Sequence, residues 1–242
     1  MGANLTQKAY RHIHGKLTSG QLSPGSRLSN RGIAKEVGIS FTPVREALQK
    51  LVSEGYLDYQ PGEGVFVPLQ SRREIEEIYE LREFLEITAI EKCCGKMPEE
   101  SLDEMARCID TQISIFELFE SKGVEALGEE DFRRKSNADA RFHVTPLESM
   151  HNRRLSRFLD DIWARMHTVY FRLIDSPLES FRKLNIEEHQ QILDGLRKGD
   201  LEAAQAALSE HIHGGLENIL AAYDKIGMKT RETKPFWVKD LD

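Results

Sequence analysis

The chain has 242 residues, which is enough for one large domain or two smaller ones. Its content of 40% hydrophobic and 30% charged residues is that of an ordinary soluble globular protein, and no apolar run approaches the about 20 residues that would span a membrane. The three cysteines are an odd and low number, and the N-terminus has no apolar signal-peptide core. We therefore expect no disulfide framework and a cytoplasmic location.

Charge is unevenly distributed along the chain. The net charge of −7 argues against indiscriminate binding to nucleic acid. Residues 1–70 nevertheless hold eight Lys or Arg against five Asp or Glu, a balance of +3 that leaves −10 for the rest of the chain. A mildly basic head on an acidic body is typical of a DNA-reading unit attached to a sensor.

Three helices are expected in the first part of the chain. The first covers residues 5–19, where apolar side chains recur at every fourth position and share one helical face: Leu5, Ala9, Ile13 and Leu17. A short second helix follows Ser29, a candidate N-cap, and ends at Gly38. The third helix follows at once, with Ser40 or Thr42 as its candidate cap.

Two β-strands are expected next, over residues 56–60 and 65–69, because the residues between them have the composition of a tight turn. Two helices joined by a tight turn and followed by a hairpin form a winged helix-turn-helix, in which the second helix of the pair lies in the major groove of DNA. We expect this unit, with three helices and a β-hairpin wing, over residues 1–69. A small α+β module without a DNA role is the alternative.

From Ser71 onward the strand signals disappear. Ser71 and Glu74 match a capping box at the start of a helix. Apolar periodicity and turn residues then predict six helices, over residues 71–92, 98–121, 131–144, 152–174, 177–197 and 200–222. We expect a mainly α protein in which residues 70–224 form an all-α antiparallel bundle of about six helices, followed by a C-terminal tail over residues 225–242.

The head contains a specific sequence pattern, in the stretches PGSRL (24–28), IAKEVGIS (33–40), TPVREAL (42–48) and EGYL (54–57). This pattern closely resembles the GntR family of bacterial regulators over most of residues 6–68. Four further stretches resemble the FCD-type ligand-binding domain of the FadR-like branch of that family: ELREFLE (80–86), DARFH (139–143), EHQQIL (188–193), and Gly199–Asp200 with His211. The resemblance implies a transcription regulator rather than an enzyme.

Four residues of the predicted bundle are candidate metal ligands. Asp139 and His143 are four residues apart and share one face of a helix. His189 and His211 lie ten residues before Gly199 and eleven after Asp200, so an antiparallel hairpin brings them level with each other. One carboxylate and three imidazoles suit Zn²⁺ best, with Ni, Mn or Fe as other candidates, and the FadR-like branch often builds its metal site at matching positions. The other histidines are expected to be ordinary surface or core residues.

Arg82 is a candidate effector-binding residue. The resemblance implies that this position faces the cavity of the bundle, where a guanidinium can bind a carboxylate through two hydrogen bonds. The effector would then be a small organic acid that also binds the metal. The alternative is a surface arginine paired with Glu86, four residues further on. The adjacent Cys93 and Cys94 are expected to be structural rather than a thiol sensor, because no basic cluster surrounds them.

The resemblance also implies which residues bind DNA: Arg31, Ser40, Thr42, Pro43 and Arg45, with Gly62 in the wing. Arg45 has the chemistry to bind guanine through two hydrogen bonds. Two positions depart from the family pattern. Phe41 stands where many relatives carry Arg, and Glu63 stands at the wing tip, where a basic or amide residue is common.

These observations predict a homodimeric regulator that binds a pseudo-palindromic double-stranded DNA operator, because two-fold protein symmetry matches two half-sites. A repressor is the favoured reading, released from its operator by a small carboxylate bound beside the metal. One alternative is a regulator whose metal is purely structural. Another is a metalloenzyme, in which Glu188 would be the general base.

Overall fold

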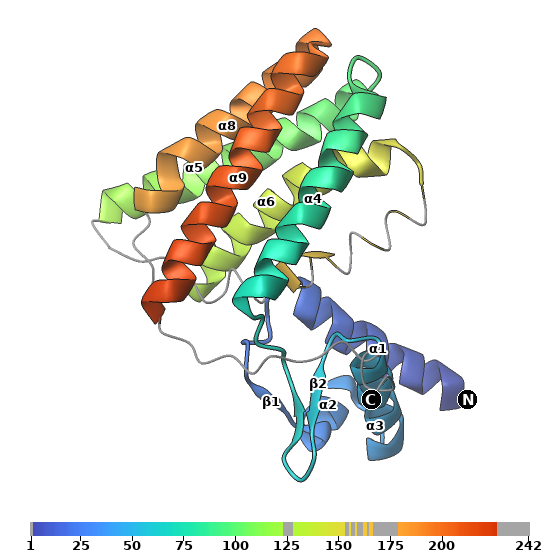
Figure 1. Cartoon of the computed structure of the whole chain (residues 1–242). Coiled ribbons are helices and arrows are strands. Elements are labelled where there is room, and N and C mark those ends of the chain that lie inside the picture. The colour runs from blue at the N-terminus through green and yellow to red at the C-terminus, as the bar shows by residue number, and fades with distance from the viewer. Residues whose placement is uncertain are drawn as a thin grey trace, which may run out of the picture.

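The computed structural model of the chain describes residues 2–122, 128–152 and 179–226, together with positions 155, 158, 162, 163, 165 and 166. A small N-terminal head of three helices and three short strands lies below a bundle of long helices (Figure 1). The expected mainly α fold class, a winged helix-turn-helix followed by an all-helical part, is confirmed.

The three helices of the head are α1 (Gly2–Thr18), α2 (Asn30–Val37) and α3 (Phe41–Ser53). Ser29 caps α2 as expected, since its hydroxyl accepts a hydrogen bond from the Gly32 amide at 3.1 Å. Gly38 ends α2 in the left-handed conformation, with φ of 71°, which an L side chain rarely adopts. This turn sets α3 at an angle to α2.

The wing is a three-stranded antiparallel sheet of order β1-β3-β2, made of β1 (Arg27–Leu28), β2 (Asp58–Gln60) and β3 (Gly64–Phe66). In the hairpin, Tyr59 is paired with Val65. The strands are shorter than expected, and β1 was not expected at all. The reason is that two residues are too few to show an alternating pattern, so only the pairing of β1 with β3 identifies it.

The head has its own apolar core, in which α1 packs on α3. Its largest members are Ile13, Leu17, Leu28, Ile33, Leu48, Leu51 and Leu57. Leu5 was expected on the buried face of α1 but is 40% exposed. Its neighbour Thr6 instead bonds the exposed Glu46 of α3, so at this first turn α1 meets α3 through polar side chains.

The bundle contains α4 (Arg72–Cys93), α5 (Glu99–Lys122), α6 (Glu129–Ser149), α8 (Glu179–Lys198) and α9 (Leu201–Ile226). The capping box at the start of α4 is present, with the Ser71 hydroxyl and the Glu74 carboxylate each accepting a backbone N–H of the other residue. The fourth expected helix, over residues 152–174, lies mostly outside the described residues, and the described positions from 155 to 166 are helical.

Several helix ends differ from expectation, most of all the C-terminal ends of α6 and α9. α6 continues through Pro146 to Ser149, although its end was expected at residue 144, because a proline removes one backbone donor without preventing the later turns from forming. α9 runs to Ile226, four residues beyond its expected end at residue 222 and into the expected tail. Within the described ranges, no helix is both long and apolar enough to cross a membrane.

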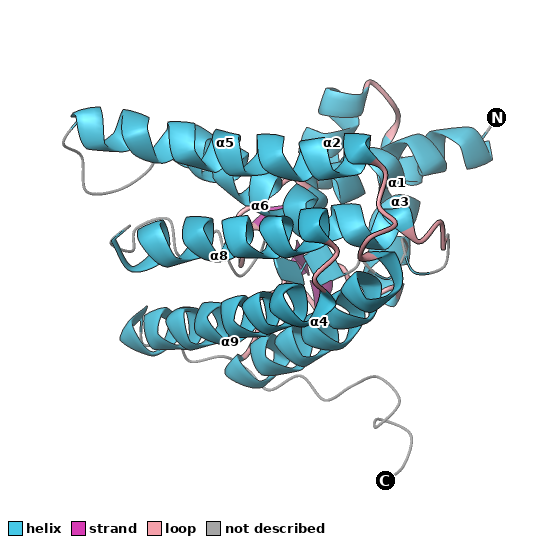
Figure 2. Cartoon of the chain, turned by 90° about the horizontal axis from the view of Figure 1, so that it is seen from above, coloured by secondary structure: helices cyan, strands magenta, loops and turns pink. Residues whose placement is uncertain are grey.

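α8 and α9 form an antiparallel hairpin and lie side by side (Figures 1 and 2). Gly199 turns the chain with φ of 69°, and the Asp200 carboxylate caps α9 by accepting the Ala203 amide at 3.1 Å. A continuous apolar core fills the bundle, with Phe142, Met105, Ile109, Leu147 and Met166 among its most buried members.

We expect Gly195→Ala to destabilise the bundle. A Cβ at this position of α8 would lie 2.9 Å from both the Cβ and the backbone nitrogen of Ala204 on α9, so the two helices would have to separate. The free energy of unfolding should fall by about 1–3 kcal/mol even though alanine favours a helix by about 1 kcal/mol. Gly214→Ala is the matched control, because its nearest neighbour would be the Glu188 Oε1 at 4.0 Å. Urea denaturation measures the stability of both variants. If Gly195→Ala were as stable as the control, the close packing of α8 on α9 would be contradicted.

Candidate metal centre and nucleic-acid interface

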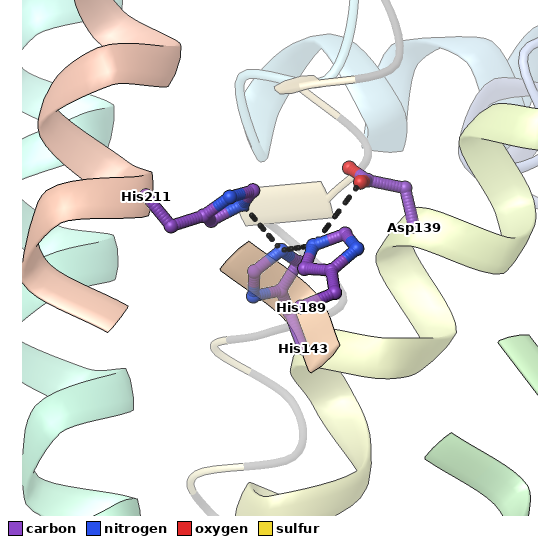
Figure 3. A group of neighbouring side chains, drawn as sticks. All are labelled: Asp139, His143, His189 and His211. Carbon is purple, nitrogen blue, oxygen red and sulfur yellow. Dashed lines mark hydrogen bonds and ion pairs between the residues drawn. The ribbon is translucent and has the colours of Figure 1, made fainter. Parts of the chain in front are cut away.

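The four candidate ligands meet in the middle of the bundle. Asp139 and His143 lie one turn apart on α6, His189 lies on α8, and His211 lies on α9 (Figure 3). All four side chains are buried, and one ligand atom from each lies within 4.8 Å of all the others. The structure thus brings together the whole set that the sequence predicts.

The three imidazoles point the same nitrogen at a common centre. His143 Nε2 lies 3.1 Å from His211 Nε2 and 3.3 Å from His189 Nε2. Asp139 Oδ1 lies 3.7 Å from His189 Nε2. Bonds of about 2.0–2.1 Å in a tetrahedral zinc site place neighbouring ligand atoms about 3.3 Å apart. The observed spacing therefore suits a single ion held between the four side chains.

The opposite nitrogens of two imidazoles are held by carboxylates. Glu86 Oε2 lies 2.7 Å from His143 Nδ1, and Glu188 Oε2 lies 2.8 Å from His211 Nδ1. A carboxylate only accepts hydrogen bonds, so each Nδ1 carries a proton, and in the neutral ring each Nε2 keeps a free lone pair. Lone pairs that face one another at 3.1 Å repel unless a cation lies between them.

The third imidazole is held by an amide. Gln112 of α5 lies 3.4 Å from His189 Nδ1, and Gln112 Oε1 has no hydrogen-bond partner within the described part of the chain. The two ends of an amide have the same shape. With the oxygen facing His189, the Gln112 side chain accepts the Nδ1 proton, its buried oxygen gains a partner, and the third Nε2 is also free for a metal.

Burial sets the protonation of these groups. Burial, reinforced by repulsion from the other two histidines, lowers the pKa of His189 well below 6.5. Burial also lowers the pKa of His211, although the hydrogen bond to Glu188 opposes it. For Asp139 burial raises the pKa, but the positive groups around it, His143 first, outweigh burial and lower it. Neutral imidazoles and an ionised carboxylate are the forms that bind a metal.

Arg82 is buried directly behind this cluster. Its Nε donates to Glu86 Oε1 at 2.9 Å, and its guanidinium lies 4.7 Å above the Trp163 ring. Burial raises the pKa of Glu86, but the charges of His143 and Arg82 outweigh it and bring that pKa down to about 2. The alternative of a surface arginine paired with Glu86 is therefore wrong about exposure, because Arg82 is buried, but it is right about the partner. Glu86 links Arg82 to His143.

Trp163 completes the surroundings of the cluster. Its ring stacks on the His143 imidazole, with centroids 5.6 Å apart. Only 5% of Trp163 is exposed, and its indole Nε1 has no hydrogen-bond partner among the described residues. Sequence reasoning missed the site roles of Trp163 and Gln112, and it considered Glu86 and Glu188 only in other roles.

The other histidines that the structure describes and the three cysteines lie outside the cluster. His12 pairs with Glu36 at 3.0 Å and His213 with Glu83 at 3.2 Å, and His167 lies outside the described residues. Burial raises the pKa of Cys93 to about 11 and also raises that of Cys94. Such thiols form little of the reactive thiolate, so this pair lacks the electrostatics of a thiol sensor.

The candidate DNA-binding residues occupy two parts of the head. Arg31 lies on α2, Ser40 precedes α3, and Thr42 and Arg45 lie on α3, all four being exposed. Pro43 is buried, so its ring packs inside the head and occupies the first turn of α3, where its missing N–H costs no hydrogen bond.

The wing presents its turn to solvent. Gly62 and Glu63 are both exposed there, and Gly62 has φ of 80°, a conformation that favours glycine. Ser40 makes no side-chain hydrogen bond to α3, which leaves its hydroxyl available at the helix start. These exposed groups suit contacts with phosphates and bases.

Comparison with known proteins supports both halves of this arrangement. Residues 5–67 match the family described as bacterial regulatory proteins, gntR family, and residues 77–214 match the FCD domain. The chain is 26% identical over 222 residues to the HTH-type transcriptional regulator McbR of Escherichia coli, covering 92% of this chain and 96% of McbR. It is also 26% identical over 198 residues to a probable D-xylose utilization operon transcriptional repressor of Paenarthrobacter nicotinovorans, covering 81% of this chain and 80% of that protein.

Solved structures show the same architecture. That of Escherichia coli McbR/YncC has a TM-score of 0.74 at 25% identity and covers 92% of this chain and 98% of its own. A putative GntR regulator from Rhodococcus sp. RHA1 has a TM-score of 0.75 at 23% identity and covers 90% and 98%. The matched families and these relatives are transcription regulators rather than enzymes, as expected. The chain is a DNA-binding transcription regulator that belongs to the GntR family and carries an FCD domain.

Proposed function

We propose that this regulator is a homodimeric repressor that senses a small carboxylic acid through a metal ion in its FCD domain. The DNA-reading unit comprises residues 1–69, and the sensing unit begins at residue 70 and includes α9, which ends at Ile226. The observation that carries the proposal is the orientation of the three histidines. The Nε2 atom of His143 lies 3.1 Å and 3.3 Å from those of His211 and His189. The Nδ1 atom of each ring faces a hydrogen-bonding side chain on the opposite side.

Buried acceptor atoms support the proposal that a metal ion binds here. Asp139 Oδ1 is buried and has no hydrogen-bond partner within the described ranges, and it lies beside the three free Nε2 atoms. A cation satisfies all of these electron-pair donors at once, whereas burying them without one is costly. One carboxylate oxygen and three imidazole nitrogens suit Zn²⁺ best, and Ni²⁺, Mn²⁺ or Fe²⁺ are the other candidates. An acid would bind as a fifth ligand, because a four-coordinate Zn²⁺ can expand to five-coordinate.

A buried hydrogen-bond donor supports the proposal that a carboxylic acid binds beside the metal. The Trp163 indole N–H has no acceptor in the described part of the chain, and a metal cannot provide one because a metal is not a hydrogen-bond acceptor. An oxygen of a bound ligand can. The charge balance also supports an acid. A divalent ion, Arg82 and Lys135 together carry four positive charges, whereas the carboxylates of Asp139, Glu86 and Glu188 carry three negative charges, which leaves one positive charge in excess. One carboxylate group neutralises that excess.

Binding of the acid would change the operator affinity by shifting the population of head orientations in the dimer. Two recognition helices then no longer match two half-sites of a pseudo-palindromic operator. The Paenarthrobacter relative is a probable repressor, which supports repression with release by the acid.

Metal affinity should depend on the carboxylate behind His211. We expect Glu188→Ala to weaken Zn²⁺ binding about 10–100-fold, because the imidazole loses the partner that orients it. Glu210→Ala, which removes an exposed carboxylate next to His211 in sequence, is the control. Competition with a chromogenic zinc chelator measures both. Equal affinity of the two variants, or a wild-type protein without zinc affinity, would be incompatible with the proposed centre.

Operator affinity should depend on Arg45. We expect Arg45→Ala to weaken binding about 5–150-fold, the loss of one bidentate contact to guanine worth about 1–3 kcal/mol. Lys50→Ala is the control on the same helix, because Lys50 lies above the Tyr10 ring at 4.7 Å and near Glu54. Fluorescence anisotropy at fixed salt is the measurement. A loss no larger than that of the control would exclude Arg45 from base recognition.

The response to acid should depend on the Trp163 N–H. Trp163→Phe keeps an aromatic ring against His143 but removes the donor, so the acid concentration that releases half of the operator should rise about tenfold or more. Zinc affinity and operator affinity without acid should stay unchanged. If no acid in a panel of small carboxylates changes the operator affinity of the zinc-loaded wild type, the sensing role fails. If metal removal then lowers the melting temperature and no acid raises it, the metal is structural.

A further inference from the structure

The first turn of α3 carries an exposed aromatic ring. Phe41 begins the helix, and 44% of it is exposed, whereas other apolar residues of α3 are buried in the head: Val44, Ala47, Leu48 and Leu51. Phe41 does not belong to the apolar core of the head. A large apolar side chain left in water gives up the free energy of burial, so its exposure here suggests contact with a partner.

Phe41 shares its side of α3 with Arg45, four residues further on. Other exposed residues of the helix are engaged within the head, because Glu46 accepts the Thr6 hydroxyl at 2.7 Å and Lys50 lies over an aromatic ring of α1 at 4.7 Å. Arg45 has no hydrogen bond or ion pair with any residue that the structure describes. The side of α3 that faces away from α1 therefore presents a ring beside a guanidinium.

In a helix-turn-helix, the N-terminal residues of the recognition helix contact base edges in the major groove. These edges carry hydrogen-bonding groups, and thymine alone adds an apolar group, the C5 methyl. A phenyl ring over a polar edge displaces water from groups that it cannot bond, which is costly. Over a methyl group, both apolar surfaces are removed from water.

We propose that Phe41 reads a thymine, its ring packing on the C5 methyl of a T·A pair next to the base pair that Arg45 contacts. This inference rests on the DNA-reading role of α3 and adds a specificity-determining residue to it. It also means that the operator of this protein has a thymine at a position where an arginine at residue 41 would select guanine.

The test removes single methyl groups from the DNA. An operator is selected with the full-length protein from a random double-stranded pool, and each thymine is replaced in turn by deoxyuridine, which lacks only the methyl. We expect one thymine in each half-site at which the replacement weakens binding about three- to fivefold, the value of one buried methyl group. Phe41→Ala should bind the thymine and uridine operators equally, and Phe41→Arg selected afresh should prefer guanine there.

Arg45→Ala is the matched control, because it should weaken binding overall while keeping the difference between thymine and uridine. Circular dichroism and melting temperature check that the variants fold, and an exposed residue such as Phe41 should alter neither. Wild-type binding that is insensitive to uridine at every position would overturn the proposal, as would a methyl effect that persists in Phe41→Ala. A pool that yields no operator at all would overturn the DNA-reading role itself, and the proposal with it.

Discussion

The meeting of three imidazole nitrogens is the constraint on which the bundle depends. Five helices of the bundle contribute to it: α4 through Glu86, α5 through Gln112, α6 through Asp139 and His143, α8 through His189, and α9 through His211. The lone pairs face one another only because groups on other helices hold the opposite ring nitrogens. An ion at this point would therefore tie the helices together, and its binding free energy would become part of the stability of the fold.

This arrangement gives the site a direct mechanical connection to the head. α4 starts at Arg72, a few residues after the last strand of the wing, and its N-terminus is anchored by the capping box at Ser71. About three turns further along the same helix lies Arg82, followed one turn later by Glu86. These two side chains pair with each other, and Glu86 also holds the His143 imidazole. In the proposed function, a ligand bound beside Arg82 or the metal would act on a helix whose N-terminal end leads to the head. Such an element can shift between orientations without any change inside the head.

The head shows how one fold can carry different DNA specificities. Apolar periodicity and glycine positions account for the core of the head, its turn at Gly38 and its wing. These features place α3 at the surface but do not specify which bases it contacts. What α3 reads depends on the few exposed side chains that its packing leaves free. Phe41 is apolar and Arg45 is a charged hydrogen-bond donor. Phe41 therefore favours the apolar methyl group of a base, and Arg45 favours a base edge that accepts hydrogen bonds.

Local patterns in the sequence predict most of the helices, the turns and the four candidate ligands. Periodicity and caps act locally, so Ser29, Gly38 and the Ser71 capping box could be identified in advance, and both ligand pairs follow from helical geometry, one along a helix and one across a hairpin. The resemblance to a family was still needed to combine the two pairs into one site. The tertiary structure alone decided that Gln112 and Trp163 border the cluster, that Arg82 is buried, and that a two-residue strand joins the wing. The physical reason is that periodicity places a side chain on a face of its helix, whereas its neighbour across the core depends on how separate helices pack.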